Sequence, residues 1–160
     1  MAVVGNILPG RIKYFIVTTL ASVINPSAAE INAGTELTPA VRLIIDAPRT
    51  GNQADDSDVS DRINKQVTAT IDLGPVTFQL KRTLVTETEY NAVVEGDSRF
   101  LVELRKGTAG ASPAAGDTAD VFTIEVNVKG PGVPGRDEVD FSTVEAVQTA
   151  VPAYDSVLAA

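Results

Sequence analysis

The chain has 160 residues and a formal net charge of −8 at pH 7, with 44% hydrophobic but only 5% aromatic residues. This length predicts a single domain spanning residues 1–160, with a core built mainly from Val, Ile, Leu and Ala. The acidic balance argues against nonspecific binding to nucleic acid or to an acidic membrane, because such binding requires a basic surface.

The sequence contains no Cys and no His, two residue types that carry much of protein chemistry. We therefore expect no disulfide and no thiolate chemistry, and the commonest general base and zinc ligand are absent. No apolar run reaches the roughly 20 residues of a membrane span, and the first residues lack the pattern of a signal peptide. We expect a protein made in the cytoplasm, without a cofactor and without a membrane partner.

The first elements are an apolar arm and a strand. Residues 1–10 are apolar but have neither helical nor strand periodicity, which predicts an extended arm. From residue 11 to residue 19 apolar side chains occupy both alternating faces, so a strand covered on both sides is expected.

A short helix and another strand follow. Ser27 and Glu30 have the spacing of a capping box, and Gly34 stands where a left-handed C-cap would end the helix, which predicts a helix over residues 25–34. Residues 41–46 are rich in β-branched and apolar side chains, so they predict a strand.

Residues 47–65 form the longest segment without a clear pattern, which predicts a long loop. The acidic run from Asp55 to Asp61 offers the oxygen ligands that calcium prefers, but it lacks the spacing, the glycine and the closing glutamate of an EF-hand. A solvated acidic loop is therefore the preferred interpretation.

The central part predicts two strands, a helix and a further strand. Gly74 and Pro75 separate a strand over residues 66–73 from one over 75–81. A second capping box, Thr86 with Glu89, begins a helix over residues 86–95. Alternating side chains then predict a strand over residues 99–106, followed by a small-residue loop to residue 118.

The clearest pattern is a hairpin over residues 119–150. Apolar residues at the even positions from 122 to 128 predict a strand with one buried face, and a Gly- and Pro-rich turn precedes a returning strand. The turn literally matches G-x-G-x-x-G, but prolines and a strand rather than a helix follow it, which favours a turn over a dinucleotide site. The polar face of this hairpin is predicted to carry Thr123, Glu125, Asn127, Glu138, Asp140 and Ser142.

No catalytic set is recognisable. Carboxylate pairs such as Glu138 with Asp140, or Glu87 with Glu89, have no other catalytic group types beside them, and no G-x-S-x-G elbow is present. Ordinary surface charge is the favoured interpretation, so we expect no enzyme activity. At the end of the chain, residues 151–160 predict a second apolar arm.

Three stretches together resemble a known family, the major tail tube proteins of long-tailed, siphovirus-type phages of actinobacteria. They are residues 26–38 (PSAAEINAGTELT), residues 99–108 (RFLVELRKGT) and residues 117–126 (DTADVFTIEV). Their order and spacing follow that family over residues 11–150. The resemblance implies a mainly β fold, a tail-tube-type β-sandwich or barrel with one flanking helix, a short N-terminal helix, terminal arms and a long loop.

The resemblance also implies what such a chain assembles with. Six copies would form a ring, rings would stack into a tube, and double-stranded DNA would pass through the lumen without specific binding. A tape measure protein and tail terminator or tip proteins are further implied partners, and the location would be the virion after assembly in the host cytoplasm. Tube proteins of contractile injection devices and monomeric capsid decoration or binding modules remain alternatives.

Assembly contacts follow from the resemblance together with the predicted elements. The polar face of the hairpin is expected to line a net negative lumen, because a basic wall would hold the DNA phosphates. The loop residues expected to contact neighbouring subunits or rings are Arg49, Asp55, Asp56, Asp58, Asp61 and Arg62. The apolar arm residues expected to pack on a neighbour are Val3, Val4, Ile7, Leu8, Val157 and Leu158.

Overall fold

The protein is mainly β, as the sequence predicts. The computed structural model describes residues 12–42, 46–55, 66–83, 85–105, 111–132 and 140–160. The helices and strands of these residues, in chain order, are β1 (Lys13–Val17), α1 (Ala28–Asn32), β2 (Thr35–Glu36), β3 (Arg49–Asp55), β4 (Gln66–Leu73), β5 (Val76–Lys81), α2 (Glu87–Ala92), β6 (Ser98–Leu104), β7 (Thr118–Pro131), β8 (Phe141–Gln148) and β9 (Ala153–Val157).

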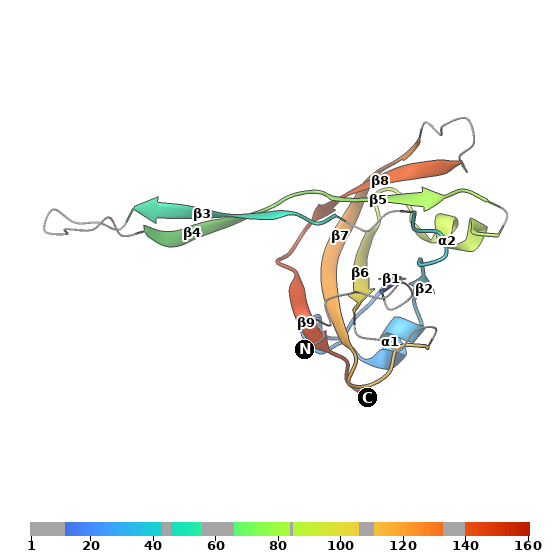
Figure 1. Cartoon of the computed structure of the whole chain (residues 1–160), viewed down its shortest axis with the longest axis horizontal. Coiled ribbons are helices and arrows are strands. Elements are labelled where there is room, and N and C mark those ends of the chain that lie inside the picture. Colours follow the sequence, from blue (N-terminus) through green and yellow to red (C-terminus); the bar gives the residue numbers. More distant parts are fainter. Residues whose placement is uncertain (1–11, 43–45, 56–65, 84, 106–110, 133–139) are drawn as a thin grey trace, which may run out of the picture.

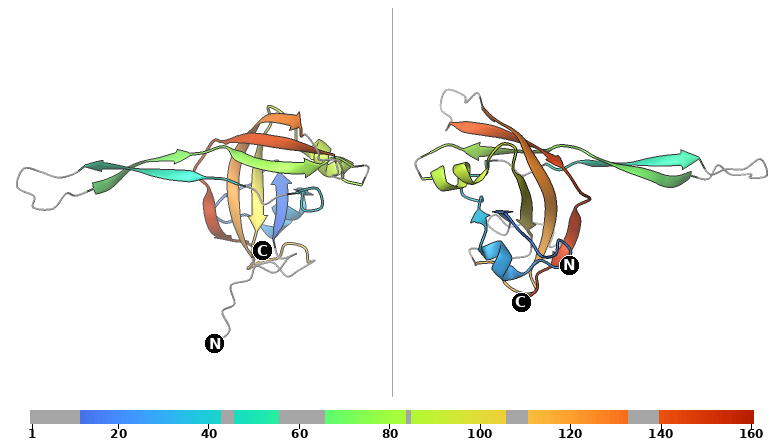
Figure 2. Two further views of the ribbon diagram at one scale, coloured as in Figure 1. Left: turned by 45° about the horizontal axis from the view of Figure 1, so that its top comes forward. Right: turned by 180° about the vertical axis from the view of Figure 1, so that it is seen from behind.

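Seven strands form one antiparallel sheet in the order β2-β1-β6-β7-β8-β5, with β9 also paired to β7. The 14 residues of β7 allow this, because its first part pairs with β9 and its second part with β8. The sheet curves into a barrel, seen in Figure 1 and from two further sides in Figure 2.

The chain after β2 closes the barrel against β5. The Lys81 amide donates to the Ala40 carbonyl (2.8 Å), and the Arg42 amide donates to the Gln79 carbonyl (2.9 Å). Of the strand expected over residues 41–46, the described residues form two isolated bridges to β5, Val41 with Leu80 and Asp46 with Thr77. Residues 43–45 lie outside the described part of the chain.

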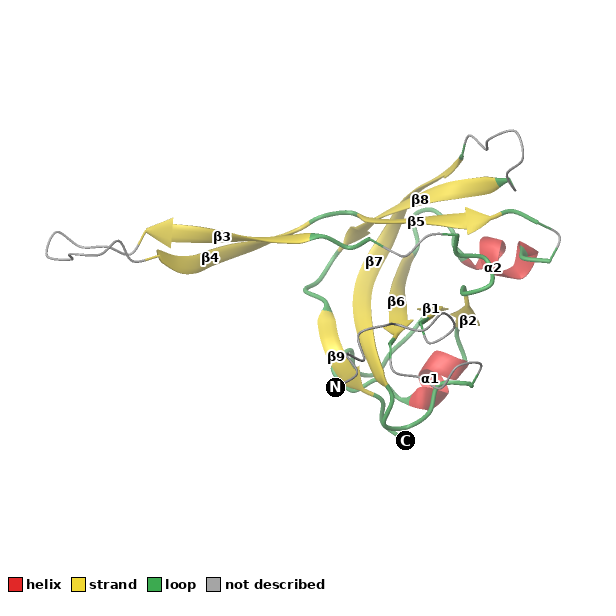
Figure 3. Ribbon diagram, in the orientation of Figure 1, coloured by secondary structure: helices red, strands yellow, loops and turns green. Residues whose placement is uncertain are grey.

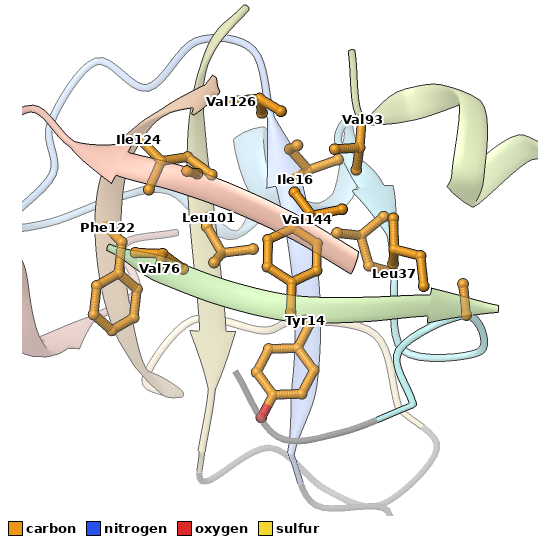
Figure 4. Packing of buried hydrophobic residues seen from close by; sticks show 14 residues of the cluster. Tyr14, Ile16, Leu37, Val76, Val93, Leu101, Phe122, Ile124, Val126 and Val144 are labelled. Atoms are coloured by element: carbon orange, nitrogen blue, oxygen red, sulfur yellow. The ribbon is translucent and has the colours of Figure 1, made fainter. Parts of the chain in front are cut away.

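Buried side chains fall into two clusters on opposite faces of the sheet. One fills the barrel, where Tyr14 and Ile16 of β1 meet Leu101, Phe122 and other apolar residues of the surrounding strands (Figure 4). The other lies outside the barrel, where Phe15 and Val17 pack with α1 and the end of the chain. The expectation that both faces of this first strand are covered is therefore confirmed.

The first helix begins as predicted but ends differently. The Ser27 hydroxyl accepts from the Glu30 amide (3.2 Å), and Glu30 Oε2 accepts from the Ser27 amide (2.9 Å), which completes the capping box. The expected left-handed C-cap at Gly34 is wrong, because Ala33 ends the helix in a right-handed conformation and Gly34 has no positive φ. Gly34 instead gives room to β1, since a Cβ there would lie 2.7 Å from the Ile16 carbonyl oxygen.

The second helix is shorter than the expected residues 86–95 and lacks its expected cap. The Thr86 hydroxyl donates to the Lys81 carbonyl (2.9 Å) and therefore does not cap α2. At the other end the Lys129 ammonium donates to the carbonyls of Tyr90 (3.1 Å) and Val93 (2.7 Å). A cation at a helix C-terminus is favourable, so Lys129 attaches α2 to the barrel.

We predict that Gly34→Ala destabilises the protein by about 1–3 kcal/mol, because the new methyl group overlaps a strand backbone that cannot move aside. Besides the Ile16 oxygen, it would meet Val17 Cγ2 at 2.8 Å. Denaturant unfolding measures the change. Gly51→Ala is the control, since a Cβ at Gly51 has no neighbour within 4 Å. Equal stability of Gly34→Ala and the parent protein would contradict the close approach.

Candidate assembly surfaces

The long loop expected over residues 47–65 is wrong for its described part, because Arg49–Asp55 is the strand β3. It pairs with β4 from Arg49↔Leu73 to Asp55↔Gln66, with a bulge after Asn52. We refer to this two-stranded ribbon, β3 and β4, as the arm. Figures 1 and 3 show it extending away from the barrel, and neither strand pairs with any other strand of the described residues.

The arm leaves the outer edges of both its strands unpaired in the single chain. In an antiparallel ribbon, about half of the backbone N–H and C=O groups of each strand point away from the partner strand. Beside the backbone, Ile71 presents an exposed apolar side chain, and Gly51 opposite it leaves open space. Unpaired edges of this length invite pairing with another chain.

Period-two patterning failed to indicate β3, whose residues 49–52 are all exposed. The residues of β3 read Arg-Thr-Gly-Asn-Gln-Ala-Asp, without an alternating apolar face. β3 could have been predicted as the hairpin partner of residues 66–73, because that segment, which follows the acidic run, was already predicted as a strand.

The loop residues predicted as contacts are separated by the structure. Arg49 lies at the end of the arm next to the barrel, which we call its root. Its guanidinium stacks there over the Tyr154 ring of β9 at 4.6 Å. Asp55 ends β3, at the far end of the described ribbon. The remaining four, Asp56, Asp58, Asp61 and Arg62, lie outside the described residues, so their contacts stay predictions. Among the described residues, no group of three or more His, Cys, Asp and Glu side chains could hold a metal ion.

The hairpin of β7 and β8 is confirmed, but its polar face differs from the expected one. Thr123 is half-buried and Glu125 and Asn127 are exposed, as a polar face requires. A bulge at Asn127 shifts the pattern by one residue, so Val128 is 48% exposed and the Lys129 side chain turns toward α2. The expectation that Val128 belongs to the buried face is therefore wrong.

The returning strand has the opposite phase to the predicted one. Ser142 is only 3% exposed and lies 3.3 Å from the Tyr90 hydroxyl, so it is not part of the polar face. Asp140 is exposed but lines a cleft beside α2, together with Arg82, Tyr90 and other residues. Glu138 lies outside the described residues. The predicted set of six thus does not form one surface.

The outward surface of the hairpin alternates carboxylates with valines. Glu125 pairs with Val147, and Val128 pairs with Glu145, across the two strands. All four side chains are exposed. We call these four residues, with the exposed Thr143 at the next outward position of β8, the hairpin face. Cations lie at the far end of β8, where Lys81 pairs with Phe141 and Arg42 stacks over that ring at 4.6 Å.

The C-terminal segment, residues 151–160, is not a free extension as the sequence predicted. β9 pairs with β7, and the Leu158 amide and carbonyl bond to Asp117 and Gly116. Leu158 is 2% exposed within its own chain, so its expected packing on a neighbour loses its basis. Val157 is half exposed and remains a candidate contact. The N-terminal residues Val3, Val4, Ile7 and Leu8 lie outside the described residues and stay predictions.

A buried charged cluster closes one end of the barrel. Glu103 of β6 and Asp120 of β7 face each other in register and are both buried. The half-exposed Arg105 guanidinium contacts both carboxylates, at 3.2 Å and 2.9 Å. Burial raises the pKa of the Glu103 carboxyl, and the charge of Asp120 adds to this, whereas Arg105 lowers it. The Arg105 charge and the hydrogen bond from the Asp155 amide to Asp120 give the buried carboxylates partners, so we interpret the cluster as structural.

The sequence matches the family described as "Phage tail tube protein" over residues 6–160, and the chain belongs to this family of structural virion proteins. Among solved structures it is similar to one titled "Crystal structure of Hcp protein", with 11% identity and a TM-score of 0.41, over 90% of this chain and 98% of that chain. The search of curated proteins gave no match. None of the described helices has the length and hydropathy needed to cross a membrane.

We predict that Glu103→Gln removes a pH dependence of stability. Folded Glu103 binds its proton more tightly than the unfolded chain does, because its pKa is raised above the ordinary 4.5. Its contribution to the free energy of unfolding therefore grows as the pH falls through the folded pKa toward 4.5, and is lost as the pH rises through the folded pKa. Denaturant unfolding at neutral pH and at about pH 5 measures this difference. An unchanged pH dependence in the variant would contradict the assignment.

Proposed function

We propose that the chain assembles as stacked hexameric rings into the tail tube of a long-tailed phage, the conduit through which genomic DNA is ejected into the host. Membership of the phage tail tube family supports a tube. The six-fold ring, the siphovirus-type tail and an actinobacterial host are what the resemblance of residues 26–38, 99–108 and 117–126 implies. A tape measure protein and terminator or tip proteins would be its other partners in the virion.

The observation that carries this proposal is the arm. An isolated two-stranded ribbon is only marginally stable by itself, and its edges are templates for further strands. A second copy of this chain is the occupant that the family favours, since a tube consists of repeated contacts between identical subunits. Pairing of the arm with the next subunit or ring would satisfy its backbone groups and join the copies.

The alternatives differ in what they leave unexplained. A monomeric decoration or binding module would keep the arm unpaired, and the family match speaks against it. A tube of a contractile injection device would use the arm in the same manner, so the type of tail is decided by whether a contractile sheath surrounds the tube in the virion.

We predict that shortening the arm blocks assembly while leaving the barrel folded. Joining Gly51 to Ile71, which face each other in register, through an Asn-Gly turn removes residues 52–70 without changing the root. Thermal unfolding should change little, because β3 and β4 pair with no strand of the barrel among the described residues. Negative-stain imaging and sedimentation should show subunits instead of tubes. Normal tubes from this variant would contradict a role for the arm.

We further propose that the hairpin face lines the lumen. Glu125 and Glu145 are the charged members of this surface, and no salt bridge to either exists among the described residues. Repeated around a ring, such carboxylates would repel the DNA phosphates, whereas each bound Lys or Arg would add to affinity through counterion release. Valines between the carboxylates offer no hydrogen bond to a passing phosphate.

We predict that Glu125→Lys with Glu145→Lys leaves tubes intact but slows DNA ejection, because basic side chains in the lumen bind phosphates. The matched control is Glu87→Lys with Asp140→Lys, which changes the net charge equally at the exposed cleft beside α2. Ejection from purified phage can be followed by the fluorescence of a DNA-binding dye. Equal ejection rates for the two double variants would contradict a luminal position of the hairpin face.

A further inference from the structure

We propose that Gln148 is a positioning residue that sets the direction of the arm, an inference that rests on the proposed role of the arm in assembly. Gln148 is the last residue of β8 and pairs with Ile124. It continues the inward row of Val144 and Ala146 and is only 7% exposed. An amide in this row stands out, because the two preceding inward positions are apolar.

The Gln148 side chain reaches both strands of the arm at their root. Its Nε2 donates to the Gly74 carbonyl oxygen (2.8 Å) and lies 3.5 Å from the Pro48 carbonyl oxygen. The Gly74 amide donates to the same Pro48 oxygen (2.9 Å). One buried amide therefore ties the residue that enters the arm and the residue that leaves it to the barrel.

Close packing and a stacking contact support the same root. A Cβ on Gly74 would lie 2.7 Å from Pro48 Cγ, so the segments entering and leaving the arm approach each other at a distance that only glycine allows. The Arg49 guanidinium stacks on Tyr154, whose ring in turn contacts Phe122 edge-on at 5.9 Å. Beyond these contacts the arm strands pair only with each other among the described residues.

The direction of the arm matters because a small rotation at its root becomes a large displacement at its far end. β4 has eight residues, which at about 3.3 Å per residue give an arm of about 25 Å. A rotation of about 10° moves the far end by about 4 Å, close to the spacing of about 4.8 Å between paired strands. A root that moves this much would prevent pairing in the correct register.

The Gln148 side chain is also a poor choice for stability alone. Its Oε1 is buried and has no hydrogen-bond partner among the described residues, and an unpaired buried carbonyl is unfavourable. A methionine of similar length would fill the same volume without this cost. If packing were the role of this position, Gln148→Met would behave as the parent protein does.

The test uses Gln148→Met and Gln148→Glu, because both keep the size of the side chain and both remove the donor. The chain has no Cys, so Gln66→Cys at the start of β4, the far end of the arm, and Thr143→Cys on β8 can carry spin labels in the unassembled subunit. Pulsed electron paramagnetic resonance then measures the distribution of the distance between arm and barrel. A label pair within the barrel, Ser98→Cys with Thr143→Cys, is the control and should remain narrow.

We expect a narrow arm-to-barrel distribution in the parent protein and a broad one in both variants, with little change in the unfolding temperature of Gln148→Met. If the competent direction is then occupied about a tenth of the time, the concentration needed for assembly rises about tenfold. An unchanged distance distribution would overturn the assignment of Gln148. A broad distribution with normal assembly would overturn the claim that arm direction matters, while failure of the shortened arm to alter assembly would contradict the proposed function itself.

Discussion

Unpaired backbone groups along the arm are the constraint on which the account depends. A backbone N–H or C=O that is paired within the fold is satisfied; on an open strand edge it can bond only to water or to another chain. The barrel removes this problem for its own strands, because residues 40–42 and 46 bond to β5 and close it. The arm does not solve it within one chain. A fold that satisfies the backbone so fully in one part and leaves it open in another is suited to pairing with copies of itself.

The barrel supplies the rigid base from which the arm projects. Its interior is packed by apolar side chains from β1, β5, β6, β7 and β8, and α1 with the end of the chain covers the outer cluster. Lys129 and the Arg105 cluster are polar attachments at the two ends of this base. Since the arm touches the base mainly at its root, the direction of the arm and the strength of the base are separable. That separation is why assembly and subunit stability are expected to respond to different substitutions.

The sequence was sufficient for elements that bury one face. Alternation in β5 and over residues 122–127 of β7, and the capping box of Ser27 with Glu30, were predicted and are present. It was not sufficient where tertiary contacts decide the outcome. The bulge at Asn127 reverses the sides of Val128 and Lys129, Thr86 bonds to Lys81 instead of capping its helix, and the sequence of β3 has no alternating apolar residues. The candidate site was predicted least well for this reason, since an assembly surface is exposed in the single chain.

Hydrogen–deuterium exchange of the arm, compared between the subunit and the assembled protein, tests the central claim most directly. Exchange reports whether backbone amides are bonded or open to water. If the arm pairs with other copies, amides of β3 and β4 should exchange rapidly in the subunit and become strongly protected in the tube, while amides of the barrel core change little. Arm amides that exchange as fast in the tube as in the subunit would contradict the account.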